Sequence, residues 1–384
     1  MMEQTGSKSI AMVAGEASGD LHGAHVVQAL RQRHADCIVF GAGGHAMQKA
    51  GAEIIVDIRE LSVMGFTAVL AKAPQILRAL SRLKQELLQR KPDLLILIDF
   101  PEFNLHLAGY AKKIGIPVLY YISPTIWAWR AGRIKKIKRR VDHMAVILPF
   151  EKPIYVRHQV PVTFVGHPLM DAAPRSNTSE RKIQSEQNLA VALLPGSRVC
   201  EITRLLPQML RAAQLLQDRM PDLRFEISRA PSIDQDLINS IARQHAQVHM
   251  MVVDDPVYVI FERCRLAIVA SGTASLEAAI SGIPTIIVYS VSALNYWLAR
   301  LLAKVPHIGL ANLIADERVL PELVQNEATA PKIAAAAYHL LNDPVAYEAM
   351  QSALHDIRAK LGQPGASERV AWLACRLMRC DCAV

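Results

Sequence analysis

Acidic side chains follow short apolar runs of this 384-residue chain, at positions where they could move protons. Asp99 ends the apolar run of the predicted strand Leu94–Asp99. A partly buried carboxylate at the end of a strand has the raised basicity that a general base needs. We therefore predict that Asp99 is catalytic; the alternative is that it only caps the helix that follows.

A second group lies in the first loop of the chain. The apolar run Ile10–Ala14 meets Gly15, and a polar loop with Glu16, Ser18 and Asp20 leads into a helical pattern. A helix start after a strand directs backbone N–H groups and a positive dipole end to one point, which is typical of an anion or sugar site. An ordinary strand-to-helix connection is the alternative, because glycine loops after strands are common.

Residues 193–198, with the sequence LLPGSR, could bind a diphosphate. The Pro-Gly turn presents Ser197 and Arg198 at the end of a predicted strand, and Glu201 follows. An arginine in this position can hold two phosphate oxygens at once through parallel hydrogen bonds. The alternative is a turn with a solvated arginine.

Residues 270–279, with the sequence ASGTASLEAA, form a second candidate phosphate site. Ser271, Gly272 and Thr273 lie between a predicted strand and a helix, where amides and hydroxyls can bind phosphate. Glu277 lies one turn inside the helix and can accept hydrogen bonds from ribose hydroxyls. Simple N-capping by Ser271 or Thr273 is the alternative.

Two segments suit a lipid surface. Residues 130–140 hold seven basic side chains and no acidic one, and Trp127 and Trp129 adjoin them. Indoles and cations occur together at membrane interfaces, whereas nucleic acid or plain solvent are the competing interpretations. Leu61–Leu80 is apolar all round, which fits either a lipid-facing segment or a buried crossover helix.

The elements that must position these groups alternate between strand and helix patterns. This alternation predicts an α/β protein with two doubly wound, Rossmann-like parallel sheets. The polar stretch Ala173–Gln187 is the predicted linker, so the domains are residues 1–172 and 188–345, and a helix at about 365–384 packs back on the first domain. Ligands are then expected at the carboxyl ends of the strands. The predicted strands are Ile10–Ala14, Cys37–Gly41, Leu94–Asp99, Val118–Ile122, His143–Leu148, Thr163–Gly166, Leu189–Leu194, Arg224–Ser228, Val248–Val253, Leu266–Ala270 and Thr285–Tyr289.

Composition narrows the class of protein. A hydrophobic content of 51% and a charged content of 20% describe a folded globular chain, and the net charge of +8 indicates an anionic partner. We expect neither a signal peptide nor a membrane-spanning helix. The six cysteines have no metal-binding spacing and are expected as reduced thiols. The glycines of FGAGGHAM do not form GxGxxG, which disfavours hydride chemistry.

Several phrases, taken together and in order, resemble the lipid-A-disaccharide synthase family, which are inverting glycosyltransferases of Gram-negative bacteria. They are GEASGD (15–20), GAGGHAMQKAG (41–51), LSVMGF (61–66), DFPEFN (99–104), YISPTIWAWR (121–130), LPFEK (148–152), VGHPLMD (165–171), LPGSR (194–198), SGTASLEAA (271–279), GLANLIADERVLPELVQ (309–325) and GASER (365–369). The sequence departs from the family pattern at His45, Ser290, Ala293 and Ala311.

The resemblance implies a glycosyltransferase-B fold without metal or cofactor. It implies transfer of 2,3-diacylglucosamine from its UDP derivative to the 6-hydroxyl of 2,3-diacylglucosamine 1-phosphate, which yields lipid A disaccharide 1-phosphate and UDP. The place of action is the inner face of the cytoplasmic membrane, as a peripheral protein. The residues that the resemblance points to are Asp99 and Glu16 for catalysis, Ser18 and Asp20 for the acceptor, and Arg198, Ser197, Glu201, Ser271, Gly272, Thr273, Glu277, Asn312, Glu322 and Gln325 for the UDP-sugar donor.

Two other interpretations remain open at this point. One is a different UDP-sugar enzyme of the same fold, such as another glycosyltransferase or an epimerase. The other is a basic module that binds membrane or nucleic acid without catalysis, although we expect no nucleic-acid partner. The sequence leaves the oligomeric state open, with a homodimer as one option, and does not indicate the acyl chain length.

Overall fold

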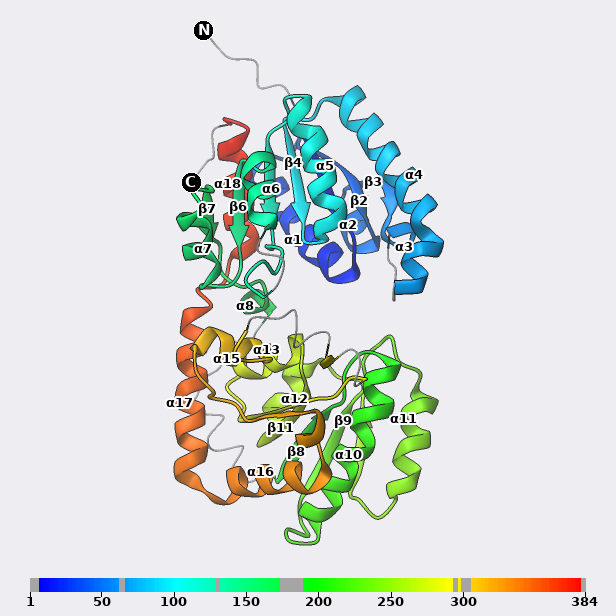
Figure 1. The fold of residues 1–384 in the computed structure, drawn as a ribbon, viewed down its shortest axis with the longest axis vertical. Helices are drawn as coiled ribbons and strands as arrows, with labels where there is room; N and C mark the ends of the chain where they lie inside the picture. The colour runs from blue at the N-terminus through cyan, green and yellow to red at the C-terminus, as the bar shows by residue number, and fades with distance from the viewer. Residues whose placement is uncertain are drawn as a thin grey trace. The chain divides into compact units, whose positions relative to one another are not determined.

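The structure is a computed structural model that describes residues 7–61, 66–128, 132–172, 189–292, 296–297 and 305–380, with only the backbone at 66–72 and 172. The chain divides into two compact units (Figure 1). Unit 1 comprises Met1–Asp171 and Gly362–Val384, and unit 2 comprises Ala172–Leu361. The predicted linker Ala173–Gln187 lies outside the described residues.

Unit 1 is built on a seven-stranded parallel sheet, sheet A, with the strand order β3-β2-β1-β4-β5-β6-β7. Its elements are β1 (Ser9–Ala14), α1 (Ala17–Arg33), β2 (Ile38–Gly43), α2 (His45–Lys49), β3 (Glu53–Asp57), α3 (Ile58–Leu61), α4 (Phe66–Arg90), β4 (Leu94–Ile98), α5 (Pro101–Lys113), β5 (Val118–Tyr121), α6 (Arg133–Arg140), β6 (His143–Val146), α7 (Glu151–Arg157), β7 (Val162–Phe164), α8 (Leu169–Ala172) and α18 (Ala366–Leu377).

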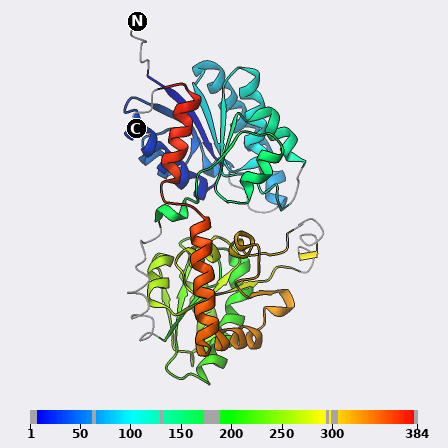
Figure 2. The same cartoon turned by 90° about the vertical axis from the view of Figure 1, so that its left-hand side faces the viewer.

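Both faces of sheet A are covered, which explains why its strands are continuous apolar runs rather than alternating ones. Alternate side chains of β1 enter different layers: Ala11 and Val13 pack toward α4 and α5, whereas Ile10 and Met12 pack toward α1 and α2. The last helix, α18, completes the second layer, where it lies against α1, β4 and β5 (Figure 2). Helix α18 is therefore part of the core of unit 1.

Unit 2 holds a six-stranded parallel sheet, sheet B, with the strand order β10-β9-β8-β11-β12-β13. Its elements are β8 (Ala190–Leu194), α10 (Val199–Gln217), β9 (Arg224–Ser228), α11 (Gln235–Ala242), η1 (Arg243–His245), β10 (Met250–Val253), α12 (Val257–Arg263), β11 (Leu266–Ala270), α13 (Thr273–Ile280), β12 (Thr285–Tyr289), α15 (Leu310–Ala315), β13 (Glu322–Val324), η2 (Gln325–Glu327), α16 (Ala330–Asn342) and α17 (Pro344–Lys360).

Local sequence explains where the long α17 of unit 2 begins. The side chain of Asp343 accepts hydrogen bonds from the backbone N–H groups of Val345 and Ala346, and Pro344 occupies the first helical position. The helix packs on α13 and α15 and belongs to unit 2 as far as Leu361. The predicted second domain ended earlier, at residue 345.

The predicted α/β class with two doubly wound parallel sheets is confirmed. Each of the eleven predicted strands corresponds to a strand of the structure, within a few residues at the ends. Two edge strands were missed, β3 and β13. Neither is fully buried, so neither shows the continuous apolar run that marks a central strand.

Candidate active site

The loops that carry the predicted site residues follow the central strands of each sheet. The strand order changes direction between β1 and β4 in sheet A, and between β8 and β11 in sheet B. At such a switch point the two neighbouring connections leave toward opposite faces, which opens a crevice at the carboxyl ends of the strands. Residues 15–20 and Asp99 flank the switch point of unit 1, whereas residues 197–198 and 271–273 flank that of unit 2.

Asp99 lies in a strained turn directly after β4. Asp99 and Phe100 have φ angles of 45° and 48°, in the left-handed region that residues other than glycine seldom adopt. The backbone N–H of Asp99 donates to the carbonyl of Tyr121 at 3.0 Å. Its carbonyl accepts from Asn104 Nδ2 at 2.7 Å and from the Tyr120 hydroxyl at 2.6 Å. These bonds fix the turn, as expected where strain serves a functional site.

Asp99 does not cap the following helix. The N-cap residue of α5 is Phe100, and no side chain makes a capping hydrogen bond there. The alternative interpretation of Asp99 is therefore wrong. Gly15 makes room for this turn, because a Cβ at Gly15 would lie 2.3 Å from Cγ of the Phe100 ring.

The environment of Asp99 favours a protonated carboxyl. Burial is the main reason that its pKa rises to about 6, the negative charge of Glu16 adds to the rise, and a backbone hydrogen bond from Phe100 opposes it. Glu16 and Ser18 are exposed at the start of α1. A carboxyl that titrates near neutral pH can accept a proton from a substrate hydroxyl at working pH.

Asp20 is buried, whereas Glu16 and Ser18, which were predicted in the same loop, are exposed. Its side chain is only 6% exposed. Its carboxylate accepts hydrogen bonds from the backbone N–H groups of Gly44, Ala46 and Met47 at 2.7, 3.0 and 3.1 Å. These bonds hold the first turn of α2 to α1, which gives Asp20 a structural role. Its predicted contact with an acceptor stays a prediction.

Sequence reasoning assigned no role to Asn104 or Tyr120, whose side chains both hold the Asp99 turn. Asn104 is fully buried, and its Nδ2 donates to the carbonyls of both Ile98 and Asp99. The available signal was an amide among apolar residues in the first turn of α5, since a buried amide needs partners. Tyr120 gave no signal, because it stands in an apolar run.

Trp127, one of the two indoles predicted to suit a membrane interface, makes side-chain contacts within unit 1. Its indole N–H donates to Glu151 Oε1 at 3.2 Å, and its ring packs edge-on against Phe150 at 5.1 Å between centroids. Burial raises the pKa of Glu151 to about 8, although hydrogen bonds from Leu148 and Trp127 oppose the rise. Trp129, its predicted companion, lies outside the described residues.

In unit 2, the turn after β8 presents Ser197 and Arg198 to solvent. Gly196 has a φ of 113°, and a Cβ there would lie 2.5 Å from the Glu201 carboxylate. Glu201 accepts hydrogen bonds from the backbone N–H of Ser197 at 3.2 Å and from Arg198 Nη1 at 2.8 Å. The Arg198 side chain remains 64% exposed, so Glu201 orients it while leaving it accessible to an anion.

The loop after β11 leads into helix α13, whose first backbone N–H groups are not capped by a side chain. The N-cap of α13 is Gly272, and no side chain makes a capping hydrogen bond there. The alternative in which Ser271 or Thr273 caps this helix is therefore wrong. A Cβ at Gly272 would meet no heavy atom of the described structure within 4 Å. An uncapped helix start with open space beside it is suited to a phosphate.

Glu277 and Tyr289 lie near these two loops. Burial raises the pKa of Glu277, and no described residue donates a hydrogen bond to its carboxylate. Tyr289 ends β12, where burial raises its pKa, the charge of Glu201 adds to the rise and Arg198 opposes it. Tyr289 was missed from sequence because it stands at the end of an apolar run, although its position after a central strand was a usable signal.

Asn312, Glu322 and Gln325 form a framework between loops. The Glu322 carboxylate accepts from the backbone N–H groups of Ile308 and Gly309 and from Asn312 Nδ2, at 2.8–3.0 Å. Asn312 also bonds the backbone of Leu320 through both ends of its amide. Gln325 bonds both backbone groups of Val291. The polar atoms of these side chains make hydrogen bonds to other groups of the protein. Their predicted contact with the donor stays a prediction.

The basic segment forms an amphipathic helix, α6, with two kinds of cation. Arg133 is buried and pairs with Glu102, and Arg140 donates to the carbonyl of Leu105 at 2.8 Å. Both were predicted to be part of a charged surface, and these contacts correct that prediction. The other four, the basic face of α6, are exposed: Lys135, Lys136, Lys138 and Arg139. Arg130 lies outside the described residues.

The apolar segment Leu61–Leu80 is a helix in its described part. Ala79 is buried in the layer between α4 and sheet A, whereas Leu77 is 62% exposed. Residues 62–65 and the side chains of 66–72 lie outside the described structure, so the choice between a lipid-facing and a buried segment stays open there. In the described part of the chain, no helix is long and apolar enough to cross a membrane.

Two Rossmann-like parallel sheets with loops suited to anions at both switch points define a glycosyltransferase-B fold. Two solved structures share this fold across nearly the whole chain. Acinetobacter baumannii MurG is 17% identical with a TM-score of 0.63, covering 95% of this chain and 99% of its own. Neisseria meningitidis UDP-GlcNAc 2-epimerase, bound to UDP-GlcNAc, is 14% identical with a TM-score of 0.65, covering 96% and 100%.

The chain belongs to the lipid-A-disaccharide synthase family. Residues 10–374 match the family described as lipid-A-disaccharide synthetase. The lipid-A-disaccharide synthase of Geobacter metallireducens is 44% identical over 377 residues, which are 97% of this chain and 98% of the relative. The protein is thus a glycosyltransferase that performs the disaccharide-forming transfer of lipid A biosynthesis. This outcome excludes the binding-module and epimerase interpretations.

The predicted departures from the family pattern lie in different surroundings. Ala311 is fully buried in α15, His45 is exposed at the first position of α2, and Ser290 is half-buried after β12. Ala293 lies outside the described residues.

Proposed function

We propose that Asp99 is the general base of the transfer. Its carboxylate takes the proton of the acceptor hydroxyl as that oxygen attacks the anomeric carbon of the donor sugar. The carbon–oxygen bond to UDP breaks on the opposite side, the bonding electron pair leaves with UDP, and the configuration inverts. The observation that supports this role is the half-buried carboxylate with a pKa of about 6, in a fixed turn at the switch point of unit 1.

The donor is UDP-2,3-diacylglucosamine, bound through its UDP part by unit 2. Arg198 pairs with the diphosphate, together with the amides and hydroxyls of Ser197 and residues 271–273. Glu277 accepts hydrogen bonds from the ribose, because its carboxylate is half-buried and has no donor among the described residues. Glu201 acts indirectly, since it orients Arg198 and the Ser197 amide.

The acceptor is 2,3-diacylglucosamine 1-phosphate, which reacts through its 6-hydroxyl. Glu16 and Ser18 are exposed beside the Asp99 turn and can bind the acceptor sugar. Glu16 has a second effect, because its negative charge helps to keep the pKa of Asp99 high. We place Asp20 behind this site as a residue that positions α1 and α2.

Both substrates carry acyl chains, so the protein must work at a lipid surface. We propose that it is a peripheral protein at the inner face of the cytoplasmic membrane and that the basic face of α6 contacts anionic lipid. Each of its four cations can contribute about 1 kcal/mol near such a surface. Ile134 and Ile137 anchor the opposite side of α6 in the core, which leaves the cations on the solvent side.

The experiment that tests the catalytic proposal is Asp99→Asn. The amide keeps the shape of the carboxyl but cannot accept the proton, so turnover should fall by about 10²–10⁴-fold. UDP affinity, measured by calorimetry, should stay within about twofold, because unit 2 supplies the proposed contacts.

Asp36→Asn is the matched control, since Asp36 is an exposed aspartate of the same unit and its replacement should leave turnover unchanged. Turnover of Asp99→Asn close to that of the control would show that another group takes the proton.

A further inference from the structure

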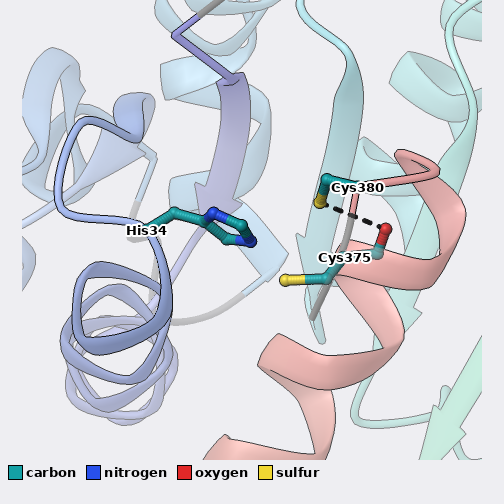
Figure 3. A group of neighbouring side chains, drawn as sticks. All are labelled: His34, Cys375 and Cys380. Carbon is teal, nitrogen blue, oxygen red and sulfur yellow. Dashed lines mark hydrogen bonds between the residues drawn. The ribbon is translucent and has the colours of Figure 1, made fainter. Parts of the chain in front are cut away.

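A histidine and two cysteines that lie far apart in the chain come together in unit 1, away from the loops of the active site. The ligand atoms of His34, Cys375 and Cys380 all lie within 4.8 Å of one another. Figure 3 shows the imidazole of His34 and the two sulfur atoms gathered in one place, the histidine at the end of α1 and the cysteines at the end of α18. Nearly the whole chain separates these two helices, so the spacing of cysteines gives no hint of the group.

The geometry at the end of α18 explains why the two cysteines meet. Arg379 has a φ of 53°, its N–H donates to the carbonyl of Arg376, and the N–H of Cys380 donates to the carbonyl of Cys375. This pattern is a Schellman motif, which brings the residue after the left-handed position against the third-last residue of the helix. Here those two residues are Cys380 and Cys375, so the turn itself pairs the thiols.

His34 brings the third ligand from a separate helix. It is the C-cap residue of α1, and its backbone N–H donates to the carbonyl of Leu30. Its Nε2 is buried and has no hydrogen-bond partner in the described structure. A buried polar atom without a partner is unusual in a native protein, and a metal ion is one partner that would satisfy it.

The C-terminal ends of α1 and α18 both lie beside the group, and each helix end carries partial negative charge, although their last turns also hold Arg31, Arg33 and Arg376. Two thiolates, a neutral imidazole and a divalent ion together would carry no net charge, which suits a partly buried place.

We propose that His34, Cys375 and Cys380 bind a zinc ion that joins α18 to α1. Thiolate sulfur and imidazole nitrogen are ligands of structural zinc, whereas magnesium and calcium prefer oxygen. Zinc–sulfur and zinc–nitrogen bonds of about 2.3 and 2.0 Å place tetrahedral ligand atoms roughly 3.5–3.8 Å apart. The observed limit of 4.8 Å therefore requires only small side-chain movements. Cys380 donates its S–H to the Cys375 carbonyl at 3.3 Å, and this proton leaves when the thiolate binds the ion.

The ion can reach the group from solvent. His34 and Cys380 are half-buried, whereas Cys375 is fully buried. The two half-buried ligands are also the better positions for substitution, because their replacement disturbs the core least. Cys200, an exposed thiol of unit 2, offers a matched control.

The test is zinc binding by the full-length chain. The purified protein is supplied with zinc, dialysed against a weak chelator and analysed for metal content by mass spectrometry. We expect about one zinc per chain in the wild type and in Cys200→Ser. His34→Gln and Cys380→Ser should bind zinc at least about 100-fold more weakly. Loss of a residue that only hydrogen-bonds a metal ligand already lowers metal affinity by about 10–100-fold, and these variants lose a ligand itself. Cobalt added to the metal-free wild type should show the charge-transfer band of thiolate ligands, and both ligand variants should lack it.

Circular dichroism checks that each variant is folded. If one of the two ligand variants misfolds, the zinc content of the other one tests the proposal. Equal zinc content in the wild type and in a folded ligand variant would overturn the proposal. A disulfide at Cys375 or Cys380 that persists in protein prepared with zinc would overturn it as well. None of these measurements uses turnover, so they are independent of the catalytic proposal.

Discussion

Glu16→Gln should move the acid limb of the pH–rate profile, because Glu16 is one of two causes of the high pKa of Asp99. If Asp99 must be ionised to act as the base, kcat/KM falls about tenfold per pH unit below its pKa of about 6. Removing the charge of Glu16 stabilises the ionised form of Asp99. The sign is therefore clear: the variant keeps its activity to lower pH than the wild type.

The size of the effect follows from the order of the causes. Burial is the larger cause and remains in the variant, so the pKa should stay well above the ordinary value of 3.8. The expected result is a pKa below about 6 that does not return to 3.8. At pH 5, only about one-tenth of Asp99 is ionised when its pKa is about 6, so the most that full ionisation could add is about tenfold. Relative to its own plateau, the variant should thus be more active than the wild type at that pH, by less than about tenfold.

The assay is kcat/KM with saturating acceptor, measured between about pH 4.5 and pH 8 and scaled to the plateau of each protein. Scaling removes any direct effect of Glu16 on acceptor binding. Glu348→Gln on α17 is the control for loss of an exposed charge and should keep the wild-type limb. An unchanged limb in Glu16→Gln, or one that moves to higher pH, would refute the proposed coupling of the two carboxyls.

Three further changes test other parts of the proposal. Arg198→Ala should weaken UDP binding and turnover together by about 10–100-fold, because the guanidinium contacts the diphosphate before and during the reaction; unchanged UDP affinity by calorimetry would rule this out. Gly15→Ala should lower the free energy of unfolding by about 1–3 kcal/mol and kcat/KM by about 10²-fold, since the new Cβ displaces Phe100 and with it the Asp99 turn; denaturant unfolding with wild-type stability and rate would contradict it. Replacing the basic face of α6 by glutamine should reduce co-sedimentation with anionic vesicles, and the remaining binding should depend less on salt; equal binding would mean that the face is only solvated.

The sequence was most informative about the centre of each sheet. A strand that is covered on both faces is apolar throughout, and the loop that follows it is polar where a ligand binds. The change from the apolar strand β4 to the polar Asp99 therefore located both the strand and the site residue. The edge strand β3 has one fully buried side chain, Val56, and lacks this contrast. Central strands and the loops after them were therefore predictable, whereas among the four edge strands β7 and β10 were predicted and β3 and β13 were missed.

The roles of individual site residues were harder to predict, because they depend on partners far along the chain. Glu16 and Asp20 belong to the same short phrase, yet one is exposed and the other bonds backbone groups about 24 residues away. Glu322 and Gln325 likewise hold loops that no local pattern connects to them. A motif therefore identified the neighbourhood of the site, and only the folded chain distinguished a side chain that faces solvent from one that holds the scaffold.

The return of the last helix to unit 1 has a consequence for how the protein is made. The ribosome releases residues 1–171 first, but the helix that covers one face of their sheet follows after all of unit 2, roughly 200 residues later. At synthesis rates of about 5–20 residues per second, the delay is about 10–40 s. During this time the apolar surface later covered by Val370, Leu373 and Ala374 is exposed to water. During synthesis, residues 1–171 therefore form an incomplete folding unit, whose second core layer is completed only when residues 366–377 have been made.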